Sequence, residues 1–113
     1  MHEIGMLRQA AKLADRIASE NGSEKVERIV IELGELSGVV PEIFTDYFPY
    51  FKEQFPKLRQ TELELHTVSG EGLCRKCNCL YNIMKNEGTC PRCGSKDKTV
   101  LGGTEVKVVS ITC

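Results

Sequence analysis

No stretch of this 113-residue sequence is long and apolar enough to span a membrane. The start, Met1-His2-Glu3, has no basic region, and neither an apolar run nor a small-residue cleavage site follows it. Internal repeats and low-complexity segments are absent as well. We therefore expect a cytoplasmic protein of one small domain, or of one domain plus a module, and no membrane partner.

A recognisable catalytic pattern is also lacking. We find neither a Ser-His-Asp set nor a glycine-rich loop that would cradle a phosphate. His66 lies among glutamates on a predicted strand, where we expect it to be solvated. The sequence therefore predicts a protein that is not an enzyme.

Net charge is small, at −1, so no general attraction to nucleic acid is expected. The charge is nevertheless uneven, because residues 1–69 hold 8 Lys/Arg and 12 Asp/Glu whereas residues 70–102 hold 6 and 3. One alternative function is thus a nucleic-acid or protein interaction module built on the basic segment. Its only aromatic side chain, Tyr81, offers poor base stacking, which argues against nucleic acid as a partner.

Periodicity predicts two helices and three main strands. Apolar residues recur at helical spacing over 4–20, and a second helix opens at Pro41, with a kink or an early end near Pro49. Alternating patterns predict strands over 25–33, 61–68 and 105–112. Because the last strand is too short to fold alone, we expect it to return to the main sheet. The body would then be discontinuous, comprising 1–69 and 103–113, with 70–102 inserted.

Five of the six cysteines lie in the inserted segment, and four of them are paired as C-x-x-C. The motif is Cys74-x2-Cys77, then 12 residues, then Cys90-x2-Cys93. Two such turns supply the four thiolates that tetrahedral Zn²⁺ takes in structural sites. Iron in a rubredoxin-like site would use the same ligands, and two disulfides are disfavoured in the expected compartment.

The other two cysteines fit the site less well. Cys79 should point away from the metal if its segment is extended, so we expect a free thiol there. Cys113 is predicted to be an incidental thiol that could pair between chains on oxidation.

The start of the chain offers a second set of metal donors. Histidine at position 2 prevents removal of Met1, so the amine, the His2 amide nitrogen and the His2 ring can chelate one ion in a plane. Glu3 can add a fourth donor. Nitrogen-rich planar sites favour Ni(II) and Cu(II). The alternative is that His2 has no such role and that Glu3 only interacts with the dipole of the first helix.

Taken together, these residues resemble the HypA/HybF hydrogenase maturation proteins. The resemblance rests on Met1-His2-Glu3, the Gly34-Glu35-Leu36-Ser37-Gly38 turn, the C-x2-C-x12-C-x2-C motif and the closing Gly103-Thr104-Glu105-Val106 strand. It covers the whole chain, in order.

The resemblance implies a nickel metallochaperone that carries Ni(II) to the large subunit of [NiFe]-hydrogenase, and in some organisms to urease. It implies nickel at Met1, His2 and Glu3, and zinc at Cys74, Cys77, Cys90 and Cys93. The implied fold is α+β: a small three-stranded sheet with two helices, joined to a zinc ribbon. The implied partners are a HypB-type GTPase and the precursor of the hydrogenase large subunit, and relatives include both monomers and homodimers. Where many relatives have an acidic residue that can help at the nickel site, this sequence has Val40, and Glu42 is the nearest carboxylate.

Overall fold

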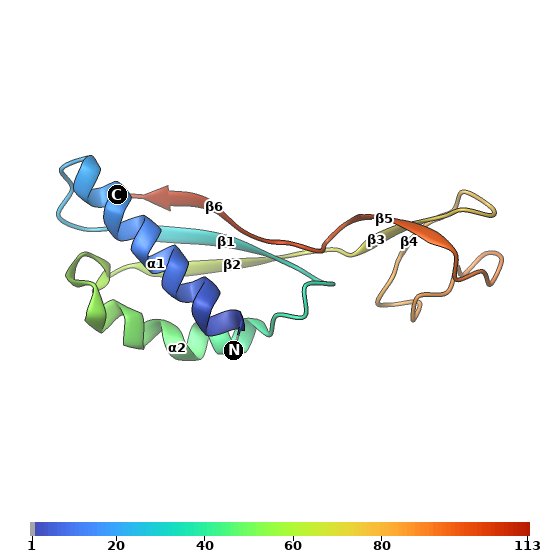
Figure 1. The fold of residues 1–113 in the computed structure, drawn as a ribbon, viewed down its shortest axis with the longest axis horizontal. Helices are drawn as coiled ribbons and strands as arrows, with labels where there is room; N and C mark the ends of the chain where they lie inside the picture. The colour runs from blue at the N-terminus through green and yellow to red at the C-terminus, as the bar shows by residue number, and fades with distance from the viewer. Residues whose placement is uncertain (1) are drawn as a thin grey trace.

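The computed structural model of the chain describes residues 2–113, and of His2 it describes the backbone only. The molecule is elongated, with extents of 55 × 25 × 17 Å. Two three-stranded sheets lie one after the other along the long axis (Figure 1). In the described chain no helix is long and apolar enough to cross a membrane.

The larger part, here called the body, contains strands β1 (Arg28–Gly34), β2 (Glu62–Val68) and β6 (Val106–Thr112). Their order is β2-β1-β6. β1 is parallel to β2, because a helix carries the chain back across the sheet between them, and antiparallel to β6. The predicted return of the last strand to the main sheet is therefore confirmed.

Helix α1 (His2–Glu20) begins two residues before the predicted start. The apolar residues at helical spacing point toward the core: Ile4 packs against it, and Leu7, Ala11, Ala14 and Ala18 are fully buried. Small alanine side chains let α1 approach the rest of the body closely. The amphipathic pattern thus placed the helix correctly.

Helix α2 (Pro41–Gln54) starts at the predicted proline. Of the two outcomes expected near Pro49, a kink or an early end, the early end is wrong, since the helix continues for five more residues. Pro49 lies on the exposed side of α2, while Phe44, Phe48 and Phe51 are buried on the other side. Burial of these three rings offsets the one missing backbone hydrogen bond. A short 3-10 helix, η1 (Pro56–Leu58), follows.

The second part, here called the ribbon, comprises residues 71–102. Its strands are β3 (Glu71–Cys74), β4 (Leu80–Asn82) and β5 (Lys98–Gly102), which form an antiparallel sheet in the order β4-β3-β5. In the chain they fall between β2 and β6. β4 ends at Asn82, because residues 83–88 form turns. The predicted α+β class is confirmed.

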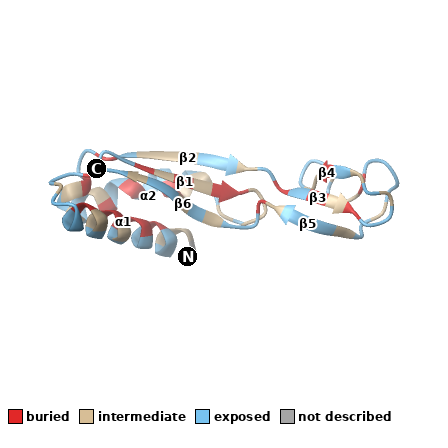
Figure 2. Cartoon of the chain, turned by 90° about the horizontal axis from the view of Figure 1, so that it is seen from above, coloured by how far each residue is buried: buried red, intermediate tan, exposed pale blue. Residues whose placement is uncertain are grey.

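Buried residues concentrate in the body (Figure 2). Its core packs the two helices against one face of the sheet, and its largest fully buried side chains include Phe44, Phe51 and Ile31. The ribbon buries far less: only Cys74, Tyr81 and Cys90 form its small core. A sheet with so little apolar packing needs another source of stability.

The two parts meet where three chain segments cross. Leu36 donates a backbone hydrogen bond to Gly103 (2.7 Å), and Glu35 donates one to Val68 (2.8 Å). At Gly34 an added Cβ would collide with the Gly103 carbonyl, and at Gly103 it would lie 2.6 Å from the Gly70 Cα. Gly103 also has a positive φ of 85°. Only glycine permits this close crossing.

Candidate metal centre

The four cysteines predicted to bind metal sit on two turns of the same geometry. In the first turn the Asn78 amide donates to the Cys74 carbonyl (2.9 Å), and in the second the Gly94 amide donates to the Cys90 carbonyl (2.9 Å). Asn78 and Gly94 both have positive φ, at 60° and 77°. This left-handed conformation turns the chain sharply after each C-x-x-C pair, which suits the Gly that follows the second pair and the Asn that follows the first.

The turns bring the four sulfurs into one group. Cys74 Sγ lies 3.5 Å from Cys93 Sγ, and Cys77 Sγ lies 3.6 Å from Cys90 Sγ. All four ligand atoms fall within 4.8 Å of one another, and no disulfide joins them. Around a tetrahedral ion with Zn–S bonds of about 2.3 Å, neighbouring sulfurs are about 3.8 Å apart. These two separations are therefore close to those of a tetrahedral site.

Backbone amides point at two of the sulfurs. Hydrogen bonds from the Cys77 and Lys76 amides lower the pKa of the Cys74 thiol, against the effect of its burial. Burial also opposes ionisation of Cys90, but hydrogen bonds from the Cys93 and Arg92 amides and from the Cys77 and Cys93 thiols together outweigh it and lower the pKa of Cys90 to about 6. Each turn thus favours one thiolate, the form that binds metal.

Cys77 behaves in the opposite way, because burial raises the pKa of its thiol to about 12. Without a cation, neighbouring thiols cannot all ionise, since their charges repel one another. A divalent cation at the centre removes that conflict and deprotonates coordinating thiols. Four sulfur donors with no open protein position suit a closed structural site, and zinc or iron fits this donor set.

The two remaining cysteines lie outside the group of four. Cys79 is half-buried, its Sγ lies 3.5 Å from the Leu80 carbonyl, and burial raises the pKa of its thiol. Cys113 is exposed.

The predicted nickel donors lie largely outside the described residues. This holds for Met1 and for the His2 side chain. Glu3 is half-buried in the first turn of α1. Val40 is the N-cap residue of α2 and is 45% exposed, and Glu42 stands in the first turn of that helix.

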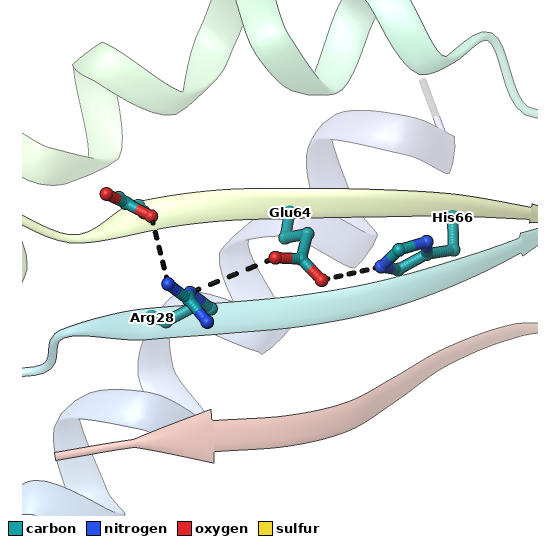
Figure 3. Close-up of polar contacts among 4 residues, drawn as sticks. Arg28, Glu64 and His66 are labelled. Carbon is teal, nitrogen blue, oxygen red and sulfur yellow. Dashed lines mark hydrogen bonds and ion pairs between the residues drawn. The ribbon is translucent and has the colours of Figure 1, made fainter.

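His66, predicted to be solvated, is exposed on the open face of the body sheet, but it does have a partner. Its Nε2 lies 2.6 Å from Glu64 Oε2, and the other Glu64 oxygen is 3.9 Å from Arg28 (Figure 3). The His66 hydrogen bond is the main reason that the pKa of Glu64 is lowered. These side chains form a row of polar contacts along β1 and β2 on the exposed face of the body sheet.

Sequence reasoning missed the role of Glu35. Its Oε1 accepts hydrogen bonds from the Gly70 amide and from Asn82 Nδ2, both at 2.9 Å. The bond from Gly70 is the largest cause of the lowered pKa of Glu35, and the bond from Asn82 is the second largest. The carboxylate belongs to the turn that follows β1 and reaches a residue of β4, so it links body and ribbon. Only its place in the Gly34–Gly38 turn singled it out in the sequence.

The whole chain is similar to one family of known proteins. A family profile described as "HypA: Hydrogenase/urease nickel incorporation, metallochaperone, hypA" matches residues 1–113. The hydrogenase maturation factor HypA of Francisella philomiragia subsp. philomiragia is 33% identical over 111 residues, covering 98% of this chain and 97% of that protein. The protein of the same description from Parabacteroides distasonis is 34% identical over 112 residues, covering 98% of this chain and 96% of that protein.

Solved structures agree in fold. A solution structure described as HypA protein superposes with a TM-score of 0.63 at 26% identity, covering 99% of this chain and 95% of the other. The solution structure of the Ni metallochaperone HypA from Helicobacter pylori superposes with a TM-score of 0.65 at 24% identity, covering 97% of this chain and 95% of the other. With the family profile matched from end to end and relatives at a third identity over nearly their whole length, this chain belongs to the HypA family.

Proposed function

We propose that this chain is a nickel carrier that binds Ni(II) at its amino terminus and delivers it during maturation of a [NiFe]-hydrogenase or a urease. The observation that carries the proposal is the end-to-end match to a family of nickel-incorporation metallochaperones. The chain acts as a carrier and not as an enzyme. Its working partners would be a HypB-type GTPase and the hydrogenase large-subunit precursor, in the cytoplasm.

The proposed nickel ligands are the Met1 amine, the His2 amide and ring nitrogens, and Glu3. Donors at a chain terminus suit a cargo ion, because a terminus can release what a buried cage would retain. Nitrogen-rich planar donor sets favour Ni(II) among the divalent ions, along with Cu(II). Binding requires proton loss from the nitrogen donors, so affinity should fall as pH drops.

We further propose that Cys74, Cys77, Cys90 and Cys93 hold a structural Zn²⁺ ion, and that the chain divides into a nickel domain (1–69 and 103–113) and a zinc domain (70–102). The sulfur separations near 3.5 Å support the zinc site. The separate strand pairing of the two sheets supports the division. Zinc would be measured by metal analysis, and a coloured protein would instead indicate iron.

The test of nickel binding is a calorimetric titration of Ni(II) into the untagged, zinc-loaded protein. Two altered forms, His2→Ala and a form with residues added before Met1, should each lose the site while zinc content stays the same. The chain has two histidines, so His66→Ala is the matched control and should bind nickel normally. Equal binding in every form would refute the amino-terminal site, and loss in His66→Ala alone would move it to the open face of the sheet.

A further inference from the structure

A groove of about 600 Å³ opens on the body between α1 and β6. α1 runs along the side of the sheet on which β6 lies (Figure 2). The groove begins at Met6, just under one helical turn after Glu3, and contains none of the residues proposed for nickel or zinc. Residues from four elements line it: Met6, Gln9, Ala10, Lys12, Leu13, Arg16, Ile31, Phe44, Val106 and Val108.

The floor of the groove is apolar and incompletely covered. Ile31 and Phe44 are buried at its base, whereas Val106, Val108 and Leu13 are only half-buried. Met6 at the margin is 37% exposed. Apolar side chains left partly open to water beside a core are a common mark of a binding surface.

The rim carries charge of one sign. Lys12 and Arg16 lie one turn apart on α1, both are exposed, and no acidic residue lines the groove. Among the described residues neither of them takes part in an ion pair. The rim therefore complements carboxylates on a partner.

One wall of the groove is a sheet edge. β6 pairs with β1 on one side, and on its other side no strand of the described chain meets it. The register shift between Val30 and Ile31 leaves Val109 as an extra residue in β6. Because a bulge interrupts further pairing, an added strand would align with Val106–Val108, the half of β6 that faces the groove.

We propose that this groove binds an extended segment of another protein, which adds as a strand to β6 with acidic residues facing Lys12 and Arg16. Such a strand gains backbone hydrogen bonds from the edge, and its alternate side chains enter the apolar floor beneath α1. Lining residues on α1 extend from Met6 to Arg16, about 15 Å, which about five extended residues span. A helix could not use the strand edge, and a second copy of this chain would bring the same positive rim against itself.

The experiment is a selection of displayed random linear peptides on the full-length, zinc-loaded protein. Enriched peptides should alternate apolar and acidic residues. Their affinity should fall by about tenfold or more with Leu13→Arg, which fills the floor, and by about tenfold with Lys12→Glu combined with Arg16→Glu, which reverses the rim. The double variant Lys25→Glu with Arg59→Glu makes the same charge change at exposed sites outside the groove and should bind normally.

Bound peptide should also shift the NMR signals of Met6, Val106 and Val108. Zinc content and amide spectra check that each variant is folded. If Leu13→Arg does not fold, the surface double variant Lys12→Glu with Arg16→Glu still decides the test. Enrichment of basic or helix-periodic peptides, or equal binding by the groove and control variants, would overturn the proposal. So would self-association by sedimentation that Leu13→Arg abolishes, because the occupant would then be a second copy. Nickel plays no part in these measurements, so their outcome is separate from that of the nickel titration.

Discussion

Body and ribbon each contain a three-stranded sheet, yet different interactions hold them together. The body packs two helices on its sheet around a core that includes three phenylalanines, whereas the ribbon buries little besides two cysteines and a tyrosine. Apolar burial scales with size, so a segment as small as the ribbon falls short of stability by packing alone. One chain thus combines a part stabilised by the hydrophobic effect with a part whose four clustered cysteines are the expected source of its stability.

Metal removal should separate the two parts most completely. Zinc chelation, or Cys90→Ser, should unfold the ribbon and leave the body folded, because a four-cysteine site stabilises only the chain that surrounds it. The measurement is a two-dimensional NMR spectrum, in which amide signals from 71–102 collapse while those of the helices persist. Cys113→Ser, at an exposed cysteine outside the cluster, should change neither zinc content nor the spectrum. Unfolding of both parts together would show that the body also depends on the metal.

The converse change is Phe44→Ala in the body. Phe44 is fully buried, and truncating such a ring costs about 3–5 kcal/mol in the free energy of unfolding. Urea unfolding followed by helix circular dichroism should report this loss, while the ribbon keeps its zinc. Tyr47→Ala on the same helix, at a side chain 44% exposed, is the control and should cost about 0.5 kcal/mol or less. Zinc loss at the urea concentration that unfolds the helices would contradict independent stability.

A smaller effect is expected at the link between the parts. Glu35→Ala removes the acceptor of the Gly70 and Asn82 hydrogen bonds, so the Gly70 amide should exchange with solvent faster while zinc content stays the same. Glu105→Ala, at a carboxylate that pairs with Lys107, should leave that exchange rate unchanged.

The same link should depend on pH in the unaltered protein. The pKa of Glu35 is lowered in the fold, so its contribution is complete above the ordinary glutamate value of 4.5 and is lost as pH falls through the lowered pKa. Slow exchange at Gly70 that is independent of Glu35 would show that the glycine crossing alone fixes the junction.

The sequence predicted most where a local pattern has one physical meaning. The C-x-x-C spacing identified four sulfurs that do meet, and apolar periodicity placed both helices and the three strands of the body. The early end expected at Pro49 as one of two outcomes was wrong, because burial of three rings outweighs the missing backbone hydrogen bond. Sequence reasoning also missed Glu35 and the groove, because both depend on residues that lie far apart in the chain, such as Glu35 with Asn82 and Met6 with Val108. A local pattern carries no information about such pairs.

The pairing of β1 with β6 has a consequence for how the chain folds. Arg28 at the start of the central strand pairs with Thr112, so the body sheet is complete only after the entire ribbon has been synthesised. Closing so long a loop is entropically slow when the intervening chain is flexible. An ion captured by the four cysteines orders that intervening chain and brings Glu71 and Gly102, its two ends, side by side. Zinc supply would then set the rate at which newly made chains reach the folded body.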